Sequence, residues 1–467
     1  MSGELPKGWA LPRLEELLDF VIGGDWGKAP ETDDEGLTDA YCIRGTEFRH
    51  WDKESGETRV LRKVKFSSLE KRVLKKGDIL IEISGGGPDQ PVGRTVLIDA
   101  KSLAVKPELP SVCTNFIRLA RPSAKLDAAY LNYYLKTFYL SGEVTNYQGG
   151  SNNLRNLKFK EYSTIPIPFA PLNEQIRIAN KLDSLLAKVG TVQTRLEKIP
   201  TLLKRFRQSI LAAATSGELT TEWRTKYPDL ITWSEQVLGD IAVVFTGVTP
   251  LKKETSYYEG GSIPWLTSSV TGLDLVTEAK SFVTEKALKE CRLKLFNPGT
   301  LLIAMYGEGK TRGQVTEIAI EATINQACAA VVVNQELASN KYVKICIEAN
   351  YEKTRMMAEG GNQPNLNLSK VRNIPINLPS EQEQKEIVRR VESLFALADS
   401  VEKQYTEAKK RTDRLTQSLL AKAFRGELVP QDPNDEPASE LLKRIQAERE
   451  IQLASKPKRK AAKGKAL

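Results

Sequence analysis

The chain has 467 residues, of which 40% are hydrophobic and 27% are charged, with 68 Lys and Arg against 59 Asp and Glu. That length allows about two to four domains, and the composition excludes a disordered or fibrous protein. The formal charge of +9 hints at a polyanionic partner. However, residues 456–467 supply six basic side chains and no acid, and without them the charge is only +3.

Two scarce residue types exclude several classes of site. His50 is the only histidine, so catalytic triads could be built only there, and sites with two histidine ligands have no second imidazole. The five cysteines are scattered without a CxxC pair, which predicts reduced thiols in the cytoplasm rather than a disulfide framework or a zinc ribbon. No apolar signal core and no run near ~18 apolar residues occur, so we expect no membrane segment.

A long internal repeat organises the chain. Glu174-Gln175 recurs as Glu383-Gln384 at an offset of 209 residues, and Gly217-Glu-Leu recurs as Gly426-Glu-Leu at the same offset without a gap. A fainter match at an offset of about 224 continues upstream through larger blocks. Each half is therefore a diverged globular block followed by a similar helical block.

Both helical blocks carry apolar residues at alternating spacings of three and four, which predicts a coiled-coil seam. The seam residues are Ile178, Leu182, Leu185, Val189 and Val192 in the first block, and Ile387, Val391, Leu394 and Val401 in the second. Pairing the two blocks gives an antiparallel intramolecular coiled coil. A single amphipathic helix lying on its own domain is the alternative. Pro200 should kink or restart the first helix.

The globular blocks mix short β-prone runs with weak helical stretches and Gly or Pro punctuation. The runs are 78–83, 95–98, 116–119, 300–305 and 329–333. We predict an α+β fold with two globular domains joined by two long helices in a pseudo-two-fold arrangement. The predicted boundaries are 1–170 and 221–378 for the globular domains, 171–220 and 379–430 for the helical spacers, and 431–467 for a charged tail with a disordered basic end.

One segment looks like a catalytic motif. Residues 304–311 follow an apolar run and approximate a phosphate-binding P-loop, with Ala304 where the first glycine belongs. Such a loop needs a helix N-terminus directly after Lys310. Residues 312–316 are glycine-broken and β-branched, so we favour a hairpin loop over a nucleotide site. No metal or cofactor site is expected on this chain.

Local features favour nucleic acid as the partner. Residues 59–76 hold eight basic side chains against one acid, a cluster suited to phosphate contacts, although a solvated charged face would look the same. Residues 149–155 and 360–365 occupy like positions in the two repeats and are rich in Asn, Gln and Arg. These side chains can read purine edges, although they are also common in turns.

The repeated motifs resemble those of the specificity subunit of type I restriction–modification systems, and the second copy ends in Gln417-Ser-Leu-Leu before Gly426-Glu-Leu. The enterobacterial type IA branch looks most similar. The resemblance covers nearly the whole chain. It implies a non-catalytic subunit whose globular blocks are target recognition domains. Each domain reads half of a bipartite asymmetric DNA site, and the coiled coil sets the unread gap.

The resemblance also implies partners: double-stranded DNA, two modification (adenine methyltransferase) subunits that dock on the spacer, and two restriction subunits. S-adenosylmethionine, ATP and Mg are expected on those partners. The DNA-reading residues expected from their chemistry are Arg94, Asn152, Asn153 and Arg155 in the first block and Lys310, Arg312, Asn362 and Gln363 in the second. Docking is expected at the exposed helix faces and the Glu-Gln and Gly-Glu-Leu ends. A P-loop NTPase with a coiled-coil arm and a non-specific coiled-coil adaptor are the alternatives.

Overall fold

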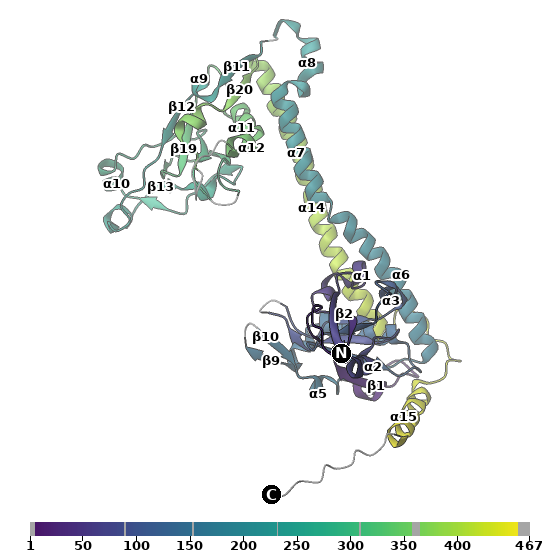
Figure 1. Cartoon of the computed structure of the whole chain (residues 1–467). Helices are drawn as coiled ribbons and strands as arrows, with labels where there is room; N and C mark the ends of the chain where they lie inside the picture. The colour runs from purple at the N-terminus through teal and green to yellow at the C-terminus, as the bar shows by residue number, and fades with distance from the viewer. Residues whose placement is uncertain are drawn as a thin grey trace, which may run out of the picture. The chain divides into compact units, whose positions relative to one another are not determined.

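The computed structural model describes residues 5–87, 90–151, 154–230, 232–307, 310–356 and 365–455. They form two compact units. Unit 1 combines residues 1–195 with 408–467, and unit 2 comprises residues 196–407. Each unit contains a globular block of sheets and short helices and a part of the long helices (Figure 1).

The globular block of unit 1 is built on an antiparallel sheet. In sheet order its strands are β1 (Leu18–Gly23), β8 (Ile117–Pro122), β4 (Ile79–Glu82) and β6 (Thr95–Leu97). A second sheet places β2 (Leu37–Ile43) between antiparallel β3 (Val60–Lys65) and parallel β7 (Ser111–Cys113). A third joins β5 (Ser84–Gly85), β10 (Leu154–Leu157) and β9 (Gln148–Ser151). The strands predicted at 78–83, 95–98 and 116–119 are confirmed as β4, β6 and β8.

Helices of unit 1 close its core. The helices of this block are α1 (Trp51–Glu54), α2 (Phe66–Arg72), α3 (Ala100–Ala104), α4 (Ala128–Leu140) and α5 (Phe159–Tyr162). Tyr130 and Tyr134 of α4 pack on Phe424, with ring centroids 5.3 Å and 5.2 Å apart. Each such buried aromatic side chain contributes about 1.5–3 kcal/mol from the area removed from water.

Unit 2 repeats this plan. In sheet order its main sheet is β12 (Ala242–Thr246), β19 (Cys328–Val333), β16 (Leu301–Ala304), β17 (Val315–Ile318) and β14 (Leu275–Val276). The smaller sheets are β15 (Phe282–Val283), β13 (Ile263–Leu266) and β18 (Thr323–Ile324), and β11 (Ser234–Val237) with β20 (Pro375–Leu378). Its short helices are α8 (Thr221–Lys226), α9 (Leu238–Ile241), α10 (Glu285–Glu290), α11 (Asn340–Ala349), α12 (Tyr351–Met356) and α13 (Leu368–Arg372). The β-runs predicted at 300–305 and 329–333 are confirmed as β16 and β19.

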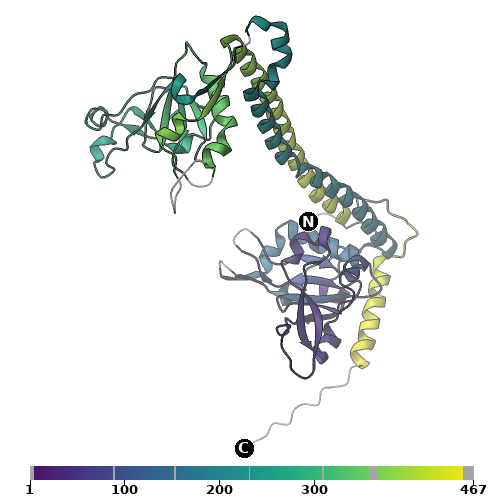
Figure 2. The ribbon, with the colours of Figure 1, turned by 45° about the horizontal axis from the view of Figure 1, so that its top comes forward.

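Long helices pair antiparallel within each unit. The first helical block is divided into α6 (Leu172–Leu196) and α7 (Ile199–Ser216), and Pro200 lies in the first turn of α7, so the predicted restart is confirmed. The second block is one helix, α14 (Glu381–Phe424). In unit 2, Arg207 of α7 forms ion pairs with Asp399 (2.5 Å) and Glu402 (3.0 Å) of α14. Figure 2 shows the two helices side by side.

Most of the predicted seam is buried, but not all of it. Ile178, Leu182 and Val189 are buried in unit 1, Ile387 and Val391 in unit 2, and Leu185 and Leu394 are half-buried. Val192 and Val401 are 46% and 36% exposed, so the seam prediction is wrong at these two positions. Val192 and Val401 both lie within unbroken helical stretches, and an apolar period alone does not show which turns of a helix are covered by a neighbour.

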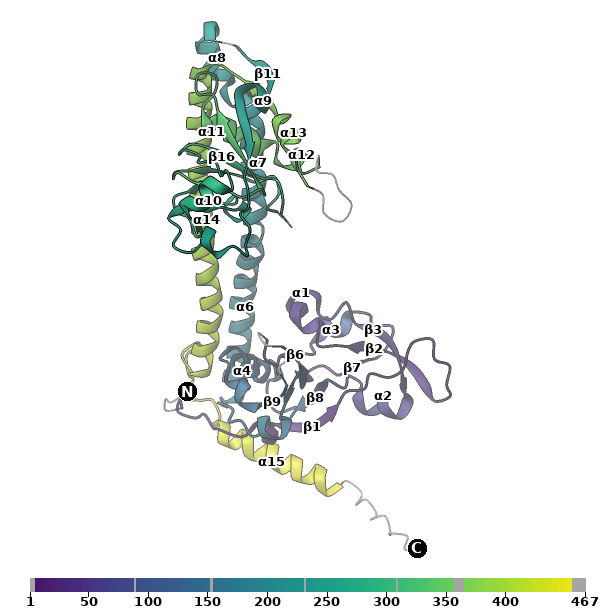
Figure 3. The ribbon, with the colours of Figure 1, turned by 90° about the vertical axis from the view of Figure 1, so that its left-hand side faces the viewer.

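A further helix, α15 (Ala438–Ser455), lies within the segment predicted to be a charged tail. Ala438, Leu441 and Ile445 are buried in the core of unit 1, and Arg449 donates to the Glu15 carbonyl at 2.6 Å. The helix α15 is labelled in Figure 3. This spacing of three and four residues was the available sequence signal. Residues 456–467 lie outside the described part. Among the described helices, none is long and apolar enough to cross a bilayer.

Candidate nucleic-acid interface

Unit 1 has a concavity of about 660 Å³ where its sheets meet. It is lined by Trp26, Arg44, Gly45, Thr46, Arg49, His50, Glu82, residues 84–86, Arg94 and residues 114–116. Phe116 and Trp26 are exposed aromatic side chains in this lining, and Arg49 is an exposed cation for which the described residues provide no ion-pair partner. Exposed aromatic and basic groups in one hollow suit contact with a nucleic acid.

Arg94 lies in the wall of this concavity, where it is held by an acidic partner. Its Nε donates to Glu82 Oε2 at 2.9 Å and its Nη2 to Glu82 Oε1 at 2.6 Å, and Nη2 also donates to the Gly45 carbonyl at 2.8 Å. Burial opposes the charge of Arg94, but the hydrogen bonds to Glu82 raise its pKa. Arg94 therefore fixes the wall, and much of its donor capacity is used within the protein.

The β9–β10 hairpin stands beside the concavity. Arg155 on β10 pairs with Gly85 of β5 on one side and with Gly150 of β9 on the other. Because Gly85 also lines the hollow, Arg155 is one strand away from it. The Arg155 guanidinium contacts Gln148 at 3.5 Å. Asn152 and Asn153, between the two strands, lie outside the described residues.

The basic cluster at 59–76 is a mixture of structural and exposed side chains. Arg59 is buried and donates to Ser111 Oγ and to three backbone carbonyls, so it is a packing residue. Arg62 stacks on Trp26 at 4.2 Å from the ring centroid. The exposed lysines of the cluster are Lys65, Lys71, Lys75 and Lys76.

In unit 2 the segment resembling a P-loop is a hairpin loop. The strand β16 is followed by β17, with Ile303 opposite Val315. No helix begins directly after Lys310, because residues 310–314 form a turn that leads into β17. The nucleotide-site alternative is therefore wrong, because the donor-rich helix N-terminus is missing. Within the described ranges, no three His, Cys, Asp or Glu side chains are arranged to hold a metal ion.

Two of the four predicted DNA-reading residues of unit 2, Lys310 and Arg312, lie in this hairpin loop. Lys310 is exposed, and its carbonyl accepts from Tyr351 Oη at 2.6 Å. Arg355 donates to the same Tyr351 oxygen at 2.8 Å, so α12 supports the loop. Arg312 is half-buried, and Asn362 and Gln363 lie outside the described residues.

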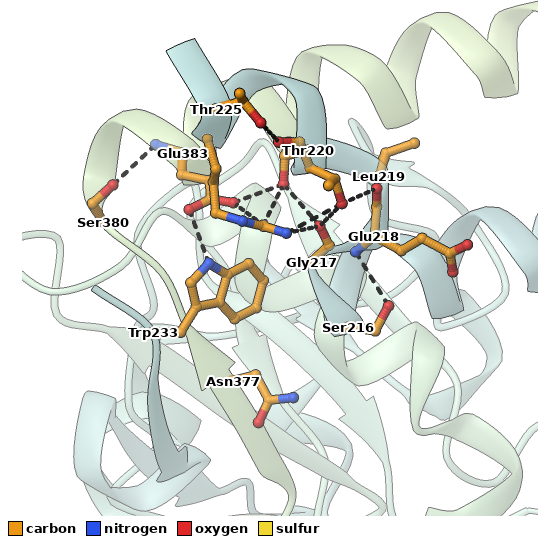
Figure 4. Close-up of polar contacts among 12 residues, drawn as sticks. Ser216, Gly217, Glu218, Leu219, Thr220, Thr225, Trp233, Asn377, Ser380 and Glu383 are labelled. Atoms are coloured by element: carbon orange, nitrogen blue, oxygen red, sulfur yellow. Dashed lines mark hydrogen bonds and ion pairs between the residues drawn. The ribbon is translucent and has the colours of Figure 1, made fainter. Parts of the chain in front are cut away.

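Buried glutamates attach the long helices to the globular blocks. In unit 2, Glu383 Oε1 accepts from Arg224 Nη1 at 2.6 Å and from Thr220 Oγ1 at 2.7 Å, while Oε2 accepts from Trp233 Nε1 at 2.9 Å (Figure 4). Gln384 next to it accepts from the Ser339 backbone N–H at 3.0 Å. Ser339 is the N-cap of α11, so this glutamine joins the start of one helix to the start of another.

Unit 1 repeats the attachment without the arginine. Glu174 Oε2 accepts from Trp9 Nε1 at 3.0 Å, and Gln175 accepts from the backbone N–H of Asp127, the N-cap of α4, at 3.0 Å. Burial raises the pKa of Glu174, and its Oε1 finds no hydrogen-bond partner among the residues that the structure describes. Because both Glu-Gln pairs are buried, the prediction that they form a docking surface is wrong. They instead attach the long helices to the globular blocks.

Comparisons with known proteins agree with the repeat. A family model described as "Type I restriction modification DNA specificity domain" matches residues 6–201 and again 231–410. The StySPI specificity subunit of Salmonella potsdam is 31% identical over 98% of this chain and 99% of its own length. The EcoKI specificity subunit of Escherichia coli strain K12 is 28% identical over the same shares.

Solved structures show the same fold. The HsdS subunit from Thermoanaerobacter tengcongensis aligns with a TM-score of 0.57 at 17% identity, covering 91% of this chain and 99% of its own. A chain from a study of type I R-M complex assembly and conformational transition aligns with a TM-score of 0.63 at 16% identity, covering 91% and 100%. With both repeats matched by the family model, the chain belongs to the type I restriction–modification DNA specificity family.

Proposed function

We propose that this chain is the non-catalytic DNA-specificity subunit of a type I restriction–modification complex. Residues 1–170 read one half of a bipartite site and residues 221–378 read the other. The observation that carries this proposal is one backbone framework built twice, with different side chains on its exposed loops. Two readers on helical spacers require two short sequences separated by unread base pairs.

The residues that we propose to contact DNA lie in or near the β9–β10 hairpin of unit 1 and the β16–β17 hairpin loop of unit 2. Arg155, Lys310 and Arg312 supply positive charge beside the reading loops, and Arg94 positions the wall of the unit 1 concavity. Asn152 and Asn153, with Asn362 and Gln363, remain proposed readers from their chemistry. Phosphate contacts from the exposed lysines of 59–76 would supply affinity without sequence preference.

Two matched pairs of exposed apolar side chains support docking of two copies of one partner. Val192 and Leu415 are 46% and 47% exposed on the paired helices of unit 1. At the repeat offset of 209 they correspond to Val401 and Phe206, which are 36% and 39% exposed on the paired helices of unit 2. Exposed apolar side chains at matched positions mark like surfaces for like partners. We assign the helix surfaces around these two pairs to two methyltransferase subunits.

The chemistry then resides on the partners. S-adenosylmethionine belongs to the methyltransferase subunits, and ATP and Mg belong to the assembled complex with two restriction subunits. Such a complex acts on chromosomal DNA in the cytoplasm. This chain contributes the choice of sequence and the spacing between the two methylated adenines.

The decisive experiment is single-molecule sequencing of genomic DNA from cells that express this chain with its methyltransferase subunit. We expect methyladenine in both halves of a bipartite motif with a fixed gap. Exchanging Met1–Ala170 for the block of another family member should change one half only. Methylation within one contiguous motif would refute the two-reader arrangement, and absence of methylation from a co-purifying complex would favour the adaptor.

The docking assignment is tested separately by native mass spectrometry of the complex. The pair Val192→Asp and Leu415→Asp should remove one methyltransferase copy, and the pair Phe206→Asp and Val401→Asp the other. Thr194→Asp, an exposed position on α6, is the matched control and should retain both copies. If both paired variants also retain two copies, docking lies elsewhere.

A further inference from the structure

One tight turn is built identically in both units. In unit 1, residues 114–117 connect β7 to β8, and Ile117 N–H donates to the Thr114 carbonyl at 3.0 Å. In unit 2, residues 325–328 connect β18 to β19, and Cys328 N–H donates to the Asn325 carbonyl at 3.1 Å. The central residues are Asn115 with Phe116 in the first turn and Gln326 with Ala327 in the second.

The surroundings establish that the two turns are equivalent. The Phe116 carbonyl accepts from Ile83 N–H at 2.9 Å, and the Ala327 carbonyl accepts from Met305 N–H at 2.8 Å. On the other side, Thr114 N–H donates to the Ile43 carbonyl at 3.0 Å, and Asn325 N–H to the Leu266 carbonyl at 2.9 Å. Asn115 and Gln326 therefore occupy the same position in the two blocks.

A glycine packs against each turn at the same point. A Cβ atom on Gly24 would lie 2.1 Å from the Thr114 carbonyl oxygen, and one on Gly247 would lie 2.4 Å from the equivalent Asn325 carbonyl oxygen. Neither approach tolerates a side chain, so each turn packs closely against the chain that follows β1 in unit 1 and β12 in unit 2. A rigid backbone presents its central side chain at low entropic cost.

The amides at these positions are exposed and take no part in the fold. Within the described part of the chain, neither the Asn115 nor the Gln326 side chain has a hydrogen-bond partner. Asn325 provides the contrast, because its Oδ1 accepts from Ala327 N–H at 3.2 Å and so supports the turn itself. Asn115 is thus not needed as a turn-former, and glutamine is not a typical one.

The setting of Asn115 suits contact with a base edge. It lies in the concavity of unit 1 beside Phe116, which is 53% exposed, and with the cation of Arg49 in the same lining. In the Gln326 turn, the Ala327 carbonyl accepts from the backbone N–H of Tyr306 at 3.4 Å, and the Tyr306 side chain is exposed. Asn115 therefore lies beside an exposed aromatic residue in the concavity, and the Gln326 turn is bonded to the backbone of an exposed tyrosine.

We propose that Asn115 and Gln326 are equivalent base-reading residues, each taking the major-groove edge of an adenine in its own half of the site. An amide side chain matches adenine because its oxygen accepts from N6 and its nitrogen donates to N7. This inference rests on the proposed function. It adds one specificity-determining residue for each half, which the motif-based candidates did not include.

The first test uses the full complex with the methyltransferase subunit and sequences genomic methyladenine. Asn115→Ala should relax one position in one half, and Gln326→Ala one position in the other half. Asn146→Ala and Asn373→Ala, exposed asparagines in the same two blocks, should leave the motif unchanged. Thermal unfolding checks the fold, which both reading variants should retain because neither side chain makes a hydrogen bond or ion pair within the described part of the chain.

The second test measures binding of the complex to duplexes of the recognised site. Asn115→Ala should weaken binding roughly 10- to 100-fold. Replacing the relaxed adenine by 7-deazaadenine, which lacks the N7 acceptor, should weaken wild-type binding and have no further effect on Asn115→Ala. The same cycle applies to Gln326→Ala in the other half.

The outcomes separate this inference from the proposed function. If the wild-type complex yields a bipartite motif and the two alanine variants keep it intact, the reading role of these amides is refuted while the specificity function stands. If each variant relaxes both halves equally, the effect is not base reading and the inference also fails. If the wild-type complex yields no bipartite motif, the proposed function itself fails.

Discussion

Replacing Arg224 by alanine should loosen the attachment of α14 in unit 2. Its guanidinium lies 2.6 Å from Glu383 Oε1, and the Glu383 side chain is fully buried. The variant keeps the hydrogen bonds from Thr220 and Trp233 but leaves a buried carboxylate without its cation. Removing one partner of a buried pair costs about 3–5 kcal/mol.

We expect a loss of about 2–3 kcal/mol, because Arg224 keeps a fifth of its side chain exposed and two neutral donors remain on the carboxylate. A chain of two units is not two-state, so native-state hydrogen exchange resolved by mass spectrometry is the suitable assay. Amides of β11, β20 and the start of α14 should lose roughly 30- to 150-fold in protection. Adding Glu383→Gln should recover part of this loss, because the amide carries no charge.

Unit 1 offers a matched control. Glu174 stands where Glu383 does but has no arginine, and Arg177 nearby pairs with Asp435 at 2.6 Å. Glu174→Gln should therefore cost less than about 1 kcal/mol, because it relieves a desolvated carboxylate while the oxygen that accepts from Trp9 is kept. Equal loss of protection for Glu174→Gln in unit 1 and Arg224→Ala in unit 2, or no loss for Arg224→Ala, would refute the reasoning.

Three further substitutions follow from the structure. Gln384→Ala should lower the protection of α11 by about 1–3 kcal/mol, because the Ser339 N–H loses its acceptor; hydrogen exchange measures it, and unchanged protection contradicts it. Burial raises the pKa of Glu348 to about 7 against the opposing charge of Lys344, so its contribution to stability falls as pH rises from 4.5 through 7. Glu348→Gln should leave stability at pH 5 nearly unchanged and raise it at pH 8 by about 1–2 kcal/mol, since the side chain is still 29% exposed; equal effects at both pH values would contradict this. Leu441→Ala should release α15 at a cost of about 2–4 kcal/mol, detected as loss of protection confined to that helix and its contacts.

Much of the fold follows from periodicity in the sequence. The apolar runs at 78–83 and 300–305 become strands in matching places, and the Glu-Gln and Gly-Glu-Leu repeats frame helices that pair antiparallel. Each of these features depends on the spacing of residues close together in the chain, so it can be predicted from one sequence. α15 was missed because its apolar spacing is short and surrounded by charge.

The candidate site was less accessible to sequence reasoning. Arg94 has the chemistry of a base reader, but only the fold brings Glu82 within 2.6 Å of it. Arg59 belongs to a basic cluster in sequence and to the core in space. Conversely, Asn115 and Gln326 lie in stretches with no evident motif, and their equivalence emerges from hydrogen bonds between strands distant in sequence.

The glutamines at the helix starts and the residues at the centres of the two turns differ in whether the fold depends on their side chains. Gln175 and Gln384 each satisfy a backbone N–H at a helix start, so another side chain there leaves a buried donor unpaired, and both repeats contain the same residue. The centre of each reading turn satisfies nothing within the chain. The hydrogen bonds that close each turn join backbone atoms, so they form equally with asparagine beside phenylalanine in one unit and with glutamine beside alanine in the other. A protein that must change what it recognises without refolding requires this separation between side chains that hold and side chains that read.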